Sequence, residues 1–147
     1  MRIDDILPGF KSIEYAEGPS LFFNAPGYLS EGSRVEAGGK FTELPSASLI
    51  ECQTSSETVY EETLYTTVLS FLMKDNPQAR PLLCELTQKE CCFRVTDVYG
   101  QKYLLGTGRR PFPIVKPSFQ SGGKGSETRA FTVEIRYVHT HSLLCLI

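Results

Sequence analysis

Two histidines, His139 and His141, are the side chains in this sequence best suited to hold a metal ion. Residues two apart on a strand point to the same face, so both imidazoles can approach one ion, with Cys145 further along that face. A catalytic zinc site takes three protein ligands, and no third ligand of the right kind is evident nearby. The pattern therefore favours edge-strand or surface histidines, and we expect no metal.

Two glycine-rich segments invite comparison with phosphate-binding loops. In the segment 121–126, Lys124 is followed by Gly125, whereas the phosphate loop of nucleotide-binding proteins needs Ser or Thr there. The segment Gly106-Thr107-Gly108 is followed by strand-like residues and Pro111, where a dinucleotide fingerprint needs a helix. Both segments are typical of flexible hairpin or crossover loops, and we expect no cofactor.

Catalytic signatures are also missing from the sequence. Serines are plentiful, but none lies in a Gly-x-Ser-x-Gly elbow. The acid pairs Asp4-Asp5 and Glu61-Glu62 are adjacent, so their carboxylates diverge on strands. The five cysteines lack Cys-x-x-Cys spacing, and adjacent Cys91 and Cys92 face opposite ways on a strand, so we expect buried, reduced thiols. The sequence predicts a protein that is not an enzyme.

Basic residues gather in the loops of the C-terminal part of the chain. They can lie together at one end of a sheet, and we interpret them as a contact to a partner or another subunit: Arg109, Arg110, Lys124 and Arg129. The alternative is nucleic-acid binding, with Tyr99, Tyr103 and Phe112 stacking on bases. The mildly acidic isoelectric point of 5.7 disfavours nucleic acid, because nucleic-acid-binding domains are usually strongly basic.

Charge is unevenly distributed along the chain. Residues 1–90 hold seven Lys and Arg against fourteen Asp and Glu, a net charge of −7. Residues 91–147 hold eight against three, a net charge of +5. The two halves either mix on the surface or form an acidic and a basic face. Opposite faces on one molecule favour head-to-tail association, which closes into rings or continues as stacks.

The elements that position these residues are mainly strands. Residues 47–53 and 58–72 read as strands, and Phe131 to His139 alternates apolar and polar side chains as a half-buried strand does. Residues 91–96 and 101–107 form a hairpin candidate around Asp97–Gly100. Asp75-Asn76-Pro77 signals the start of a helix whose core-facing stripe follows i, i+3, i+4, i+7 spacing: Ala79, Leu82, Leu83 and Leu86.

These elements predict a single domain over residues 1–147 with a β-rich α+β fold. The architecture is either a small antiparallel barrel or a sandwich, with one packed helix. Residues 24–46 are weakly patterned and predict an irregular excursion that reaches another subunit or forms a lid. No apolar run approaches the roughly 20 residues that cross a bilayer, so we expect no membrane association.

The pattern from Val59 to Leu146 resembles small tail or virion structural proteins encoded by prophages of gut Bacteroidetes-like bacteria. The resemblance is carried by the strand 60–66, the Leu-rich helix and the hairpin 96–107, and by Arg110-Pro111-Phe112-Pro113, Ser121-Gly122-Gly123 and the strand 130–137. The opening, residues 3–15, is similar in style, whereas residues 24–46 do not match. The resemblance implies a protein without enzymatic activity that assembles as rings or stacked tubes.

The sequence therefore leads to two main functional hypotheses, with a small enzyme that has an unrecognised site as a third. The first is a phage-derived structural subunit that self-associates or docks on other phage structural proteins, in the host cytoplasm or in a virion. The alternative is a monomeric binding module for nucleic acid or a small ligand, using the basic loops.

Overall fold

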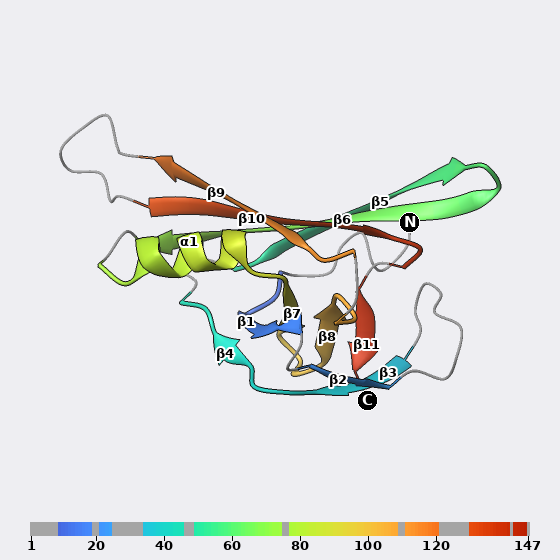
Figure 1. Ribbon diagram of the computed structural model, residues 1–147, viewed down its shortest axis with the longest axis horizontal. Helices are drawn as coiled ribbons and strands as arrows, with labels where there is room; N and C mark the ends of the chain where they lie inside the picture. Colours follow the sequence, from blue (N-terminus) through green and yellow to red (C-terminus); the bar gives the residue numbers. More distant parts are fainter. Residues whose placement is uncertain are drawn as a thin grey trace.

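The computed structural model describes residues 9–18, 21–24, 34–45, 49–74, 77–108, 111–120, 130–141 and 143–146. Within these residues the chain forms eleven strands and one helix, arranged in two sheets (Figure 1). The β-rich α+β class is thus confirmed. Of the two predicted architectures it is the sandwich that forms, because neither sheet closes into a barrel.

The first sheet has seven strands. In spatial order they are β2 (Phe22–Asn24), β3 (Arg34–Gly38), β11 (Leu144–Leu146), β8 (Lys102–Leu105), β7 (Cys91–Thr96), β1 (Ser12–Glu17) and β4 (Thr42–Glu43). All its neighbours are antiparallel except β11 and β3, which run parallel. The strand nearest the C-terminus therefore lies inside the sheet and joins β3 to β8.

The second sheet has four long antiparallel strands and forms the upper layer in Figure 1. In spatial order they are β5 (Glu51–Val59), β6 (Glu62–Lys74), β10 (Ala130–His139) and β9 (Ile114–Gln120). The alternation predicted for the strand up to His139 is confirmed by β10. Its odd-numbered side chains from Phe131 to Tyr137 are buried, and its even-numbered ones are more exposed.

The main hydrophobic core lies between the two sheets. The upper sheet contributes side chains such as Leu69 and Ile135, and the lower sheet contributes Ile13, Phe93 and Leu105. A second, smaller cluster lies on the opposite face of the lower sheet, around Val35, Leu104 and Leu144. Because Leu104 and Leu105 point to opposite faces, β8 contributes to both clusters.

The helix α1 (Ala79–Gln88) connects β6 to β7 and fills the layer between the sheets at one end (Figure 1). Its predicted core-facing stripe is confirmed, since Ala79, Leu83 and Leu86 are buried and Leu82 is partly buried against the core. The helix begins after Gln78, whose side chain makes no capping hydrogen bond. The predicted capping residues, Asp75 and Asn76, lie outside the described residues.

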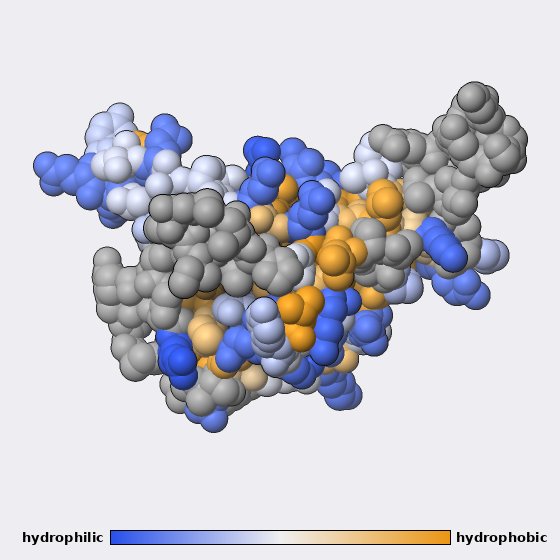
Figure 2. Space-filling view, turned by 180° about the vertical axis from the view of Figure 1, so that it is seen from behind, coloured by the Kyte–Doolittle hydropathy of each residue, from blue (hydrophilic) through white to orange (hydrophobic). Residues whose placement is uncertain are grey.

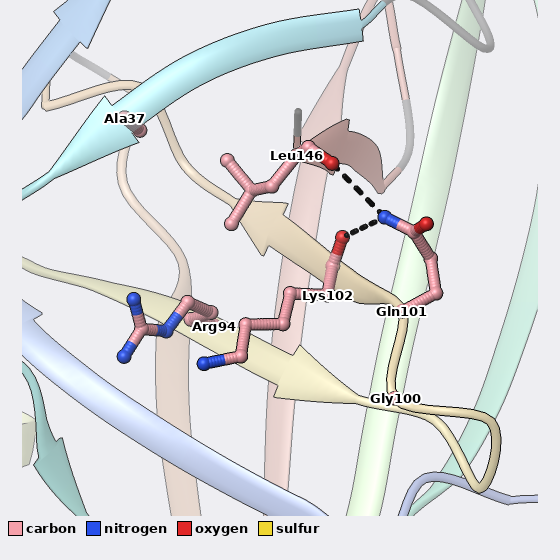
Figure 3. Close-up of a pocket in the computed structure, with 6 residues that line it drawn as sticks. All are labelled: Ala37, Arg94, Gly100, Gln101, Lys102 and Leu146. Atoms are coloured by element: carbon pink, nitrogen blue, oxygen red, sulfur yellow. Dashed lines mark hydrogen bonds between the residues drawn. The ribbon is translucent and has the colours of Figure 1, made fainter.

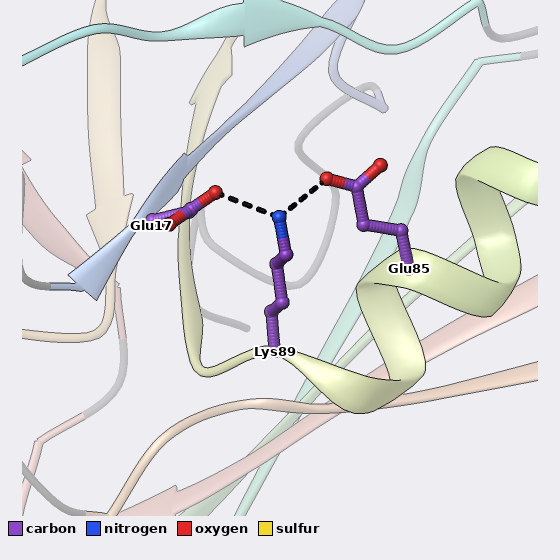
Figure 4. A network of polar contacts seen from close by, with 3 residues as sticks. All are labelled: Glu17, Glu85 and Lys89. Carbon is purple, nitrogen blue, oxygen red and sulfur yellow. Dashed lines mark hydrogen bonds and ion pairs between the residues drawn. The ribbon is translucent and has the colours of Figure 1, made fainter.

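A lysine network ties the end of α1 to the lower sheet (Figure 4). The Nζ of Lys89 donates to Glu85 Oε1 at 2.7 Å and to Glu17 Oε1 of β1 at 3.0 Å. These two carboxylates raise the pKa of the Lys89 ammonium. All three side chains are about half exposed, so the network orients the helix end more than it stabilises the fold.

Two sequence-based expectations differ from the structure. The single strand predicted over 58–72 is wrong, because the chain reverses at Tyr60 and Glu61 and separates β5 from β6. The excursion predicted over 24–46 contains β3 and β4, so its described part is largely strand. Its residues 25–33 and 46 lie outside the described residues.

Candidate interaction surface

The four predicted contact residues lie outside the described residues, namely Arg109, Arg110, Lys124 and Arg129, and so does the glycine-rich loop 121–126. The preceding glycines turn the chain after β8, with positive φ at Gly106 and Gly108. A Cβ at Gly106 would lie 3.0 Å from the Sγ of Cys92. The Gly108 N–H donates to the same sulfur at 3.2 Å. These glycines therefore serve close packing of the chain against β7.

The two histidines lie side by side at the end of β10. Their ring centroids are 4.3 Å apart, and the ring of Tyr137 lies 5.6 to 5.7 Å from each. The sequence predicts that both histidines lie on an edge strand or at the surface; a surface position is wrong for His141, which is fully buried. Burial and the neighbouring His141 lower the pKa of His139. In the described part of the chain, no three His, Cys, Asp or Glu side chains are grouped to hold a metal ion.

The thiols of β7 are poorly suited to nucleophilic chemistry. Cys91 and Cys92 are both buried, on opposite faces of the strand, as the sequence predicted. Burial raises the pKa of each thiol to about 11. A thiolate is the reactive form, so both groups stay protonated at neutral pH and behave as small apolar side chains.

Two buried residues with hydroxyl groups are cross-strand neighbours in the upper sheet. Tyr137 of β10 pairs with Thr67 of β6, and both are almost fully buried. Neither hydroxyl has a hydrogen-bond partner among the residues that the structure describes. Burial, and to a smaller extent nearby Cys92, raises the pKa of the Tyr137 hydroxyl. We therefore interpret these two hydroxyl groups as destabilising the core, and not as parts of a binding or catalytic site.

The feature that stands out from the body of the molecule is the end of the β5–β6 hairpin. Strand β10 accompanies β6 only from Tyr65 onward, so residues 57–64 form a two-stranded extension, here called the ribbon. The ribbon projects beyond both layers in Figure 1 and is mostly hydrophilic in Figure 2. A two-stranded hairpin is at best marginally stable in water, so the ribbon gains little from its own contacts.

The tip of the ribbon is conformationally strained. The two-residue turn has positive φ at both positions, 49° at Tyr60 and 67° at Glu61. Asn-Gly is the usual pair in such a turn, because most other residues destabilise it by about 1 kcal/mol each when their backbone adopts the left-handed conformation. Tyr60 is also 96% exposed, so its ring gains nothing from packing within the chain. This turn gives no local signal in the sequence, because it contains no Gly, Asn or Pro.

The edge strands of the two sheets are protected to different degrees. Edges β2 and β4 have only three and two residues, and β9 carries Pro117, which weakens pairing with a further strand. Edge β5, by contrast, has nine residues, mostly exposed, with no proline, lysine or arginine. Among the described edges, β5 is therefore the one best able to meet another chain.

A pocket of about 320 Å³ lies on the outer face of the lower sheet (Figure 3). Its lining residues are Ala37, Arg94, Gly100, Gln101, Lys102 and Leu146. Strand register explains the grouping, because Arg94 pairs with Leu104, and Lys102 lies two residues before Leu104 on the same face. The preceding turn is fixed by Asp97, whose carboxylate accepts N–H bonds from Tyr99 and Gln101 at 2.9 Å.

The pocket carries two cationic groups, and Figure 3 shows both pointing to the same side. Arg94 donates to both carboxylate oxygens of Glu14, at 3.0 and 2.7 Å, and its guanidinium lies 4.1 Å from the ring centroid of Phe41. This bidentate bond uses two of the five guanidinium N–H groups and balances the charge of Arg94. The exposed Lys102 therefore leaves the pocket with a net positive charge.

Comparison with known proteins returned no match to this chain among protein-family models, curated proteins or solved structures.

Proposed function

We propose that this chain is a non-enzymatic structural subunit that acts in phage tail or virion assembly through contacts with copies of itself and with other structural proteins. The observation that carries the proposal is the ribbon, whose strained tip holds an exposed aromatic side chain away from the body. Strained backbone positions of this kind concentrate at functional sites, which makes the tip a candidate contact. The phage assignment itself rests on the sequence resemblance.

The distribution of charge supports association between copies. The hairpin from Glu51 to Lys74 contains four glutamates, and its single cation is Lys74 at the end opposite the tip. The C-terminal part of the chain, which includes the pocket residues Arg94 and Lys102, is basic. Opposite charges on one molecule attract a second copy in a defined orientation. In the part that the structure describes, no helix has the length and apolar character to cross a bilayer.

The experiment is the mass in solution, measured by light scattering on a sizing column across a concentration series and at two salt concentrations. We expect oligomers that dissociate as salt rises, because screening weakens contacts between exposed charges. Arg110→Glu should weaken association and leave the monomer folded. Lys40→Glu reverses an exposed charge outside the basic segment and is the matched control. A chain that stays monomeric under all conditions would contradict self-association.

A further inference from the structure

We propose that the Tyr60–Glu61 tip of one copy docks into the Arg94–Lys102 pocket of a second copy. This inference rests on the proposed function, since it names the two surfaces through which copies associate. The tip belongs to the upper sheet, and the pocket lies on the outer face of the lower sheet. One copy can therefore use both surfaces at once, each with a different neighbour. Such a head-to-tail contact continues from copy to copy or closes into a ring.

The chemistry of the pocket matches a tyrosine ring. Leu146 and Ala37 provide apolar surface, and the guanidinium of Arg94 can meet the face of an aromatic ring. Within its own chain, Arg94 already lies over the ring of Phe41. The pocket volume of about 320 Å³ is at the small end of binding pockets, which suits one side chain better than a larger ligand.

The charges also match. Glu61 follows Tyr60 at the tip, and Glu57 and Glu62 lie on the same ribbon, with no Lys or Arg between residues 40 and 74. Because Glu14 balances Arg94, the ammonium of Lys102 is the pocket's cation available for an incoming carboxylate. A Glu61–Lys102 contact fixes the orientation of the two copies. The ring of Tyr60, which becomes buried when the tip docks, supplies the apolar anchor.

The strained turn gives the first test. Replacing Tyr60→Asn together with Glu61→Gly installs the pair that this turn favours. We expect a monomer that melts at a higher temperature than wild type, yet associates about tenfold or more weakly, as when a hot-spot aromatic is removed. Higher stability excludes misfolding as the cause of weaker association. A variant that associates as tightly as wild type would overturn the proposal.

A charge exchange gives the second test. Glu61→Lys and Lys102→Glu should each weaken association, because like charges then meet in every contact between identical copies. In an equimolar mixture of the two variants, each tip meets a pocket of opposite charge on the other variant. We therefore expect the mixture to regain wild-type association in sedimentation velocity. Glu43→Lys and Lys74→Glu, which reverse exposed charges elsewhere, are the matched controls.

The outcomes separate this inference from the proposed function. If the wild-type chain associates and the exchange variants associate equally well, the tip–pocket contact is wrong and self-association stands. If the variants weaken association but their mixture does not restore it, the pairing of these two surfaces is wrong. If the wild-type chain is monomeric at every concentration and salt level, the self-association in the proposed function is wrong, and the inference fails with it.

Discussion

Replacing Tyr137 by phenylalanine should make this protein more stable. The Tyr137 side chain is 1% exposed, and its hydroxyl has no hydrogen-bond partner among the described residues. A buried polar group without a hydrogen-bond partner destabilises the folded state by about 1–3 kcal/mol, because the same group is hydrated in the unfolded chain. Phenylalanine keeps the ring and its packing against the core and removes the hydroxyl. Part of the gain is offset by the small void that remains.

We expect the free energy of unfolding to rise by about 1 kcal/mol in Tyr137→Phe. For a chain of this size, that corresponds to a melting temperature about 2–4 °C higher. Urea unfolding followed by circular dichroism measures the difference, and an unchanged slope shows that the unfolded state is unaffected. Tyr99→Phe is the matched control, because Tyr99 is 82% exposed and its hydroxyl is hydrated in both states.

The pH dependence gives an independent check on Tyr137. Burial raises the pKa of its hydroxyl above the ordinary value of 10.0. The folded state therefore holds this proton more tightly, and the associated stability is complete below pH 10 and lost as pH rises above it. Cys91 and Cys92 add a loss that begins near pH 9, common to wild type and variant. The difference between the two proteins above pH 10 isolates Tyr137.

A destabilised Tyr137→Phe variant would refute this reasoning, because it would show that the hydroxyl makes a favourable hydrogen bond. An equal loss of stability above pH 10 in both proteins would also refute it, because it would show that burial does not raise the pKa of the Tyr137 hydroxyl.

The remaining predictions concern the helix and the thiols. Leu83→Ala should lower the free energy of unfolding by about 2–5 kcal/mol, because Leu83 is buried on the core face of α1. Cys84→Ala, on the exposed face of the helix, should change the free energy of unfolding by less than about 0.5 kcal/mol. Urea unfolding measures both effects, and equal effects would contradict the assigned helix face. Iodoacetamide should modify exposed Cys84 in the folded protein, while Cys91 and Cys92 react only after unfolding because they are buried and their pKa is about 11. Peptide mass spectrometry reads this order, and early labelling of Cys92 would contradict it.

Elements with strong local signals were predictable from the sequence. The hairpin of β7 and β8 follows from Asp97 and Gly100, since the Asp97 carboxylate holds two backbone N–H groups and Gly100 has a positive φ of 90°. The helix follows from its apolar spacing and β10 from strict alternation. In each case the sequence pattern that predicts the element lies within about ten residues, the range over which hydrophobic periodicity is recognised.

The features that escaped prediction depend on distant parts of the chain. The turn at Tyr60 and Glu61 lacks the residues that mark turns, so only the pairing of β5 with β6 reveals it. The burial of His141 depends on the packing around the end of β10. The pocket combines side chains from β3, β7, β8 and β11 and from the turn before β8, which no local pattern brings together. The candidate contact surface was therefore the least predictable part of the molecule.

The position of β11 affects how the chain folds as it is synthesised. In the lower sheet, β11 separates β3 from β8, yet it is synthesised after all the other strands that the structure describes. The β2–β3 pair must therefore wait for β11 before it can join the rest of the sheet. Such late, long-range closure slows folding and prolongs exposure of unpaired strand edges. Production at low temperature or with a chaperone should consequently favour the native protein over aggregates.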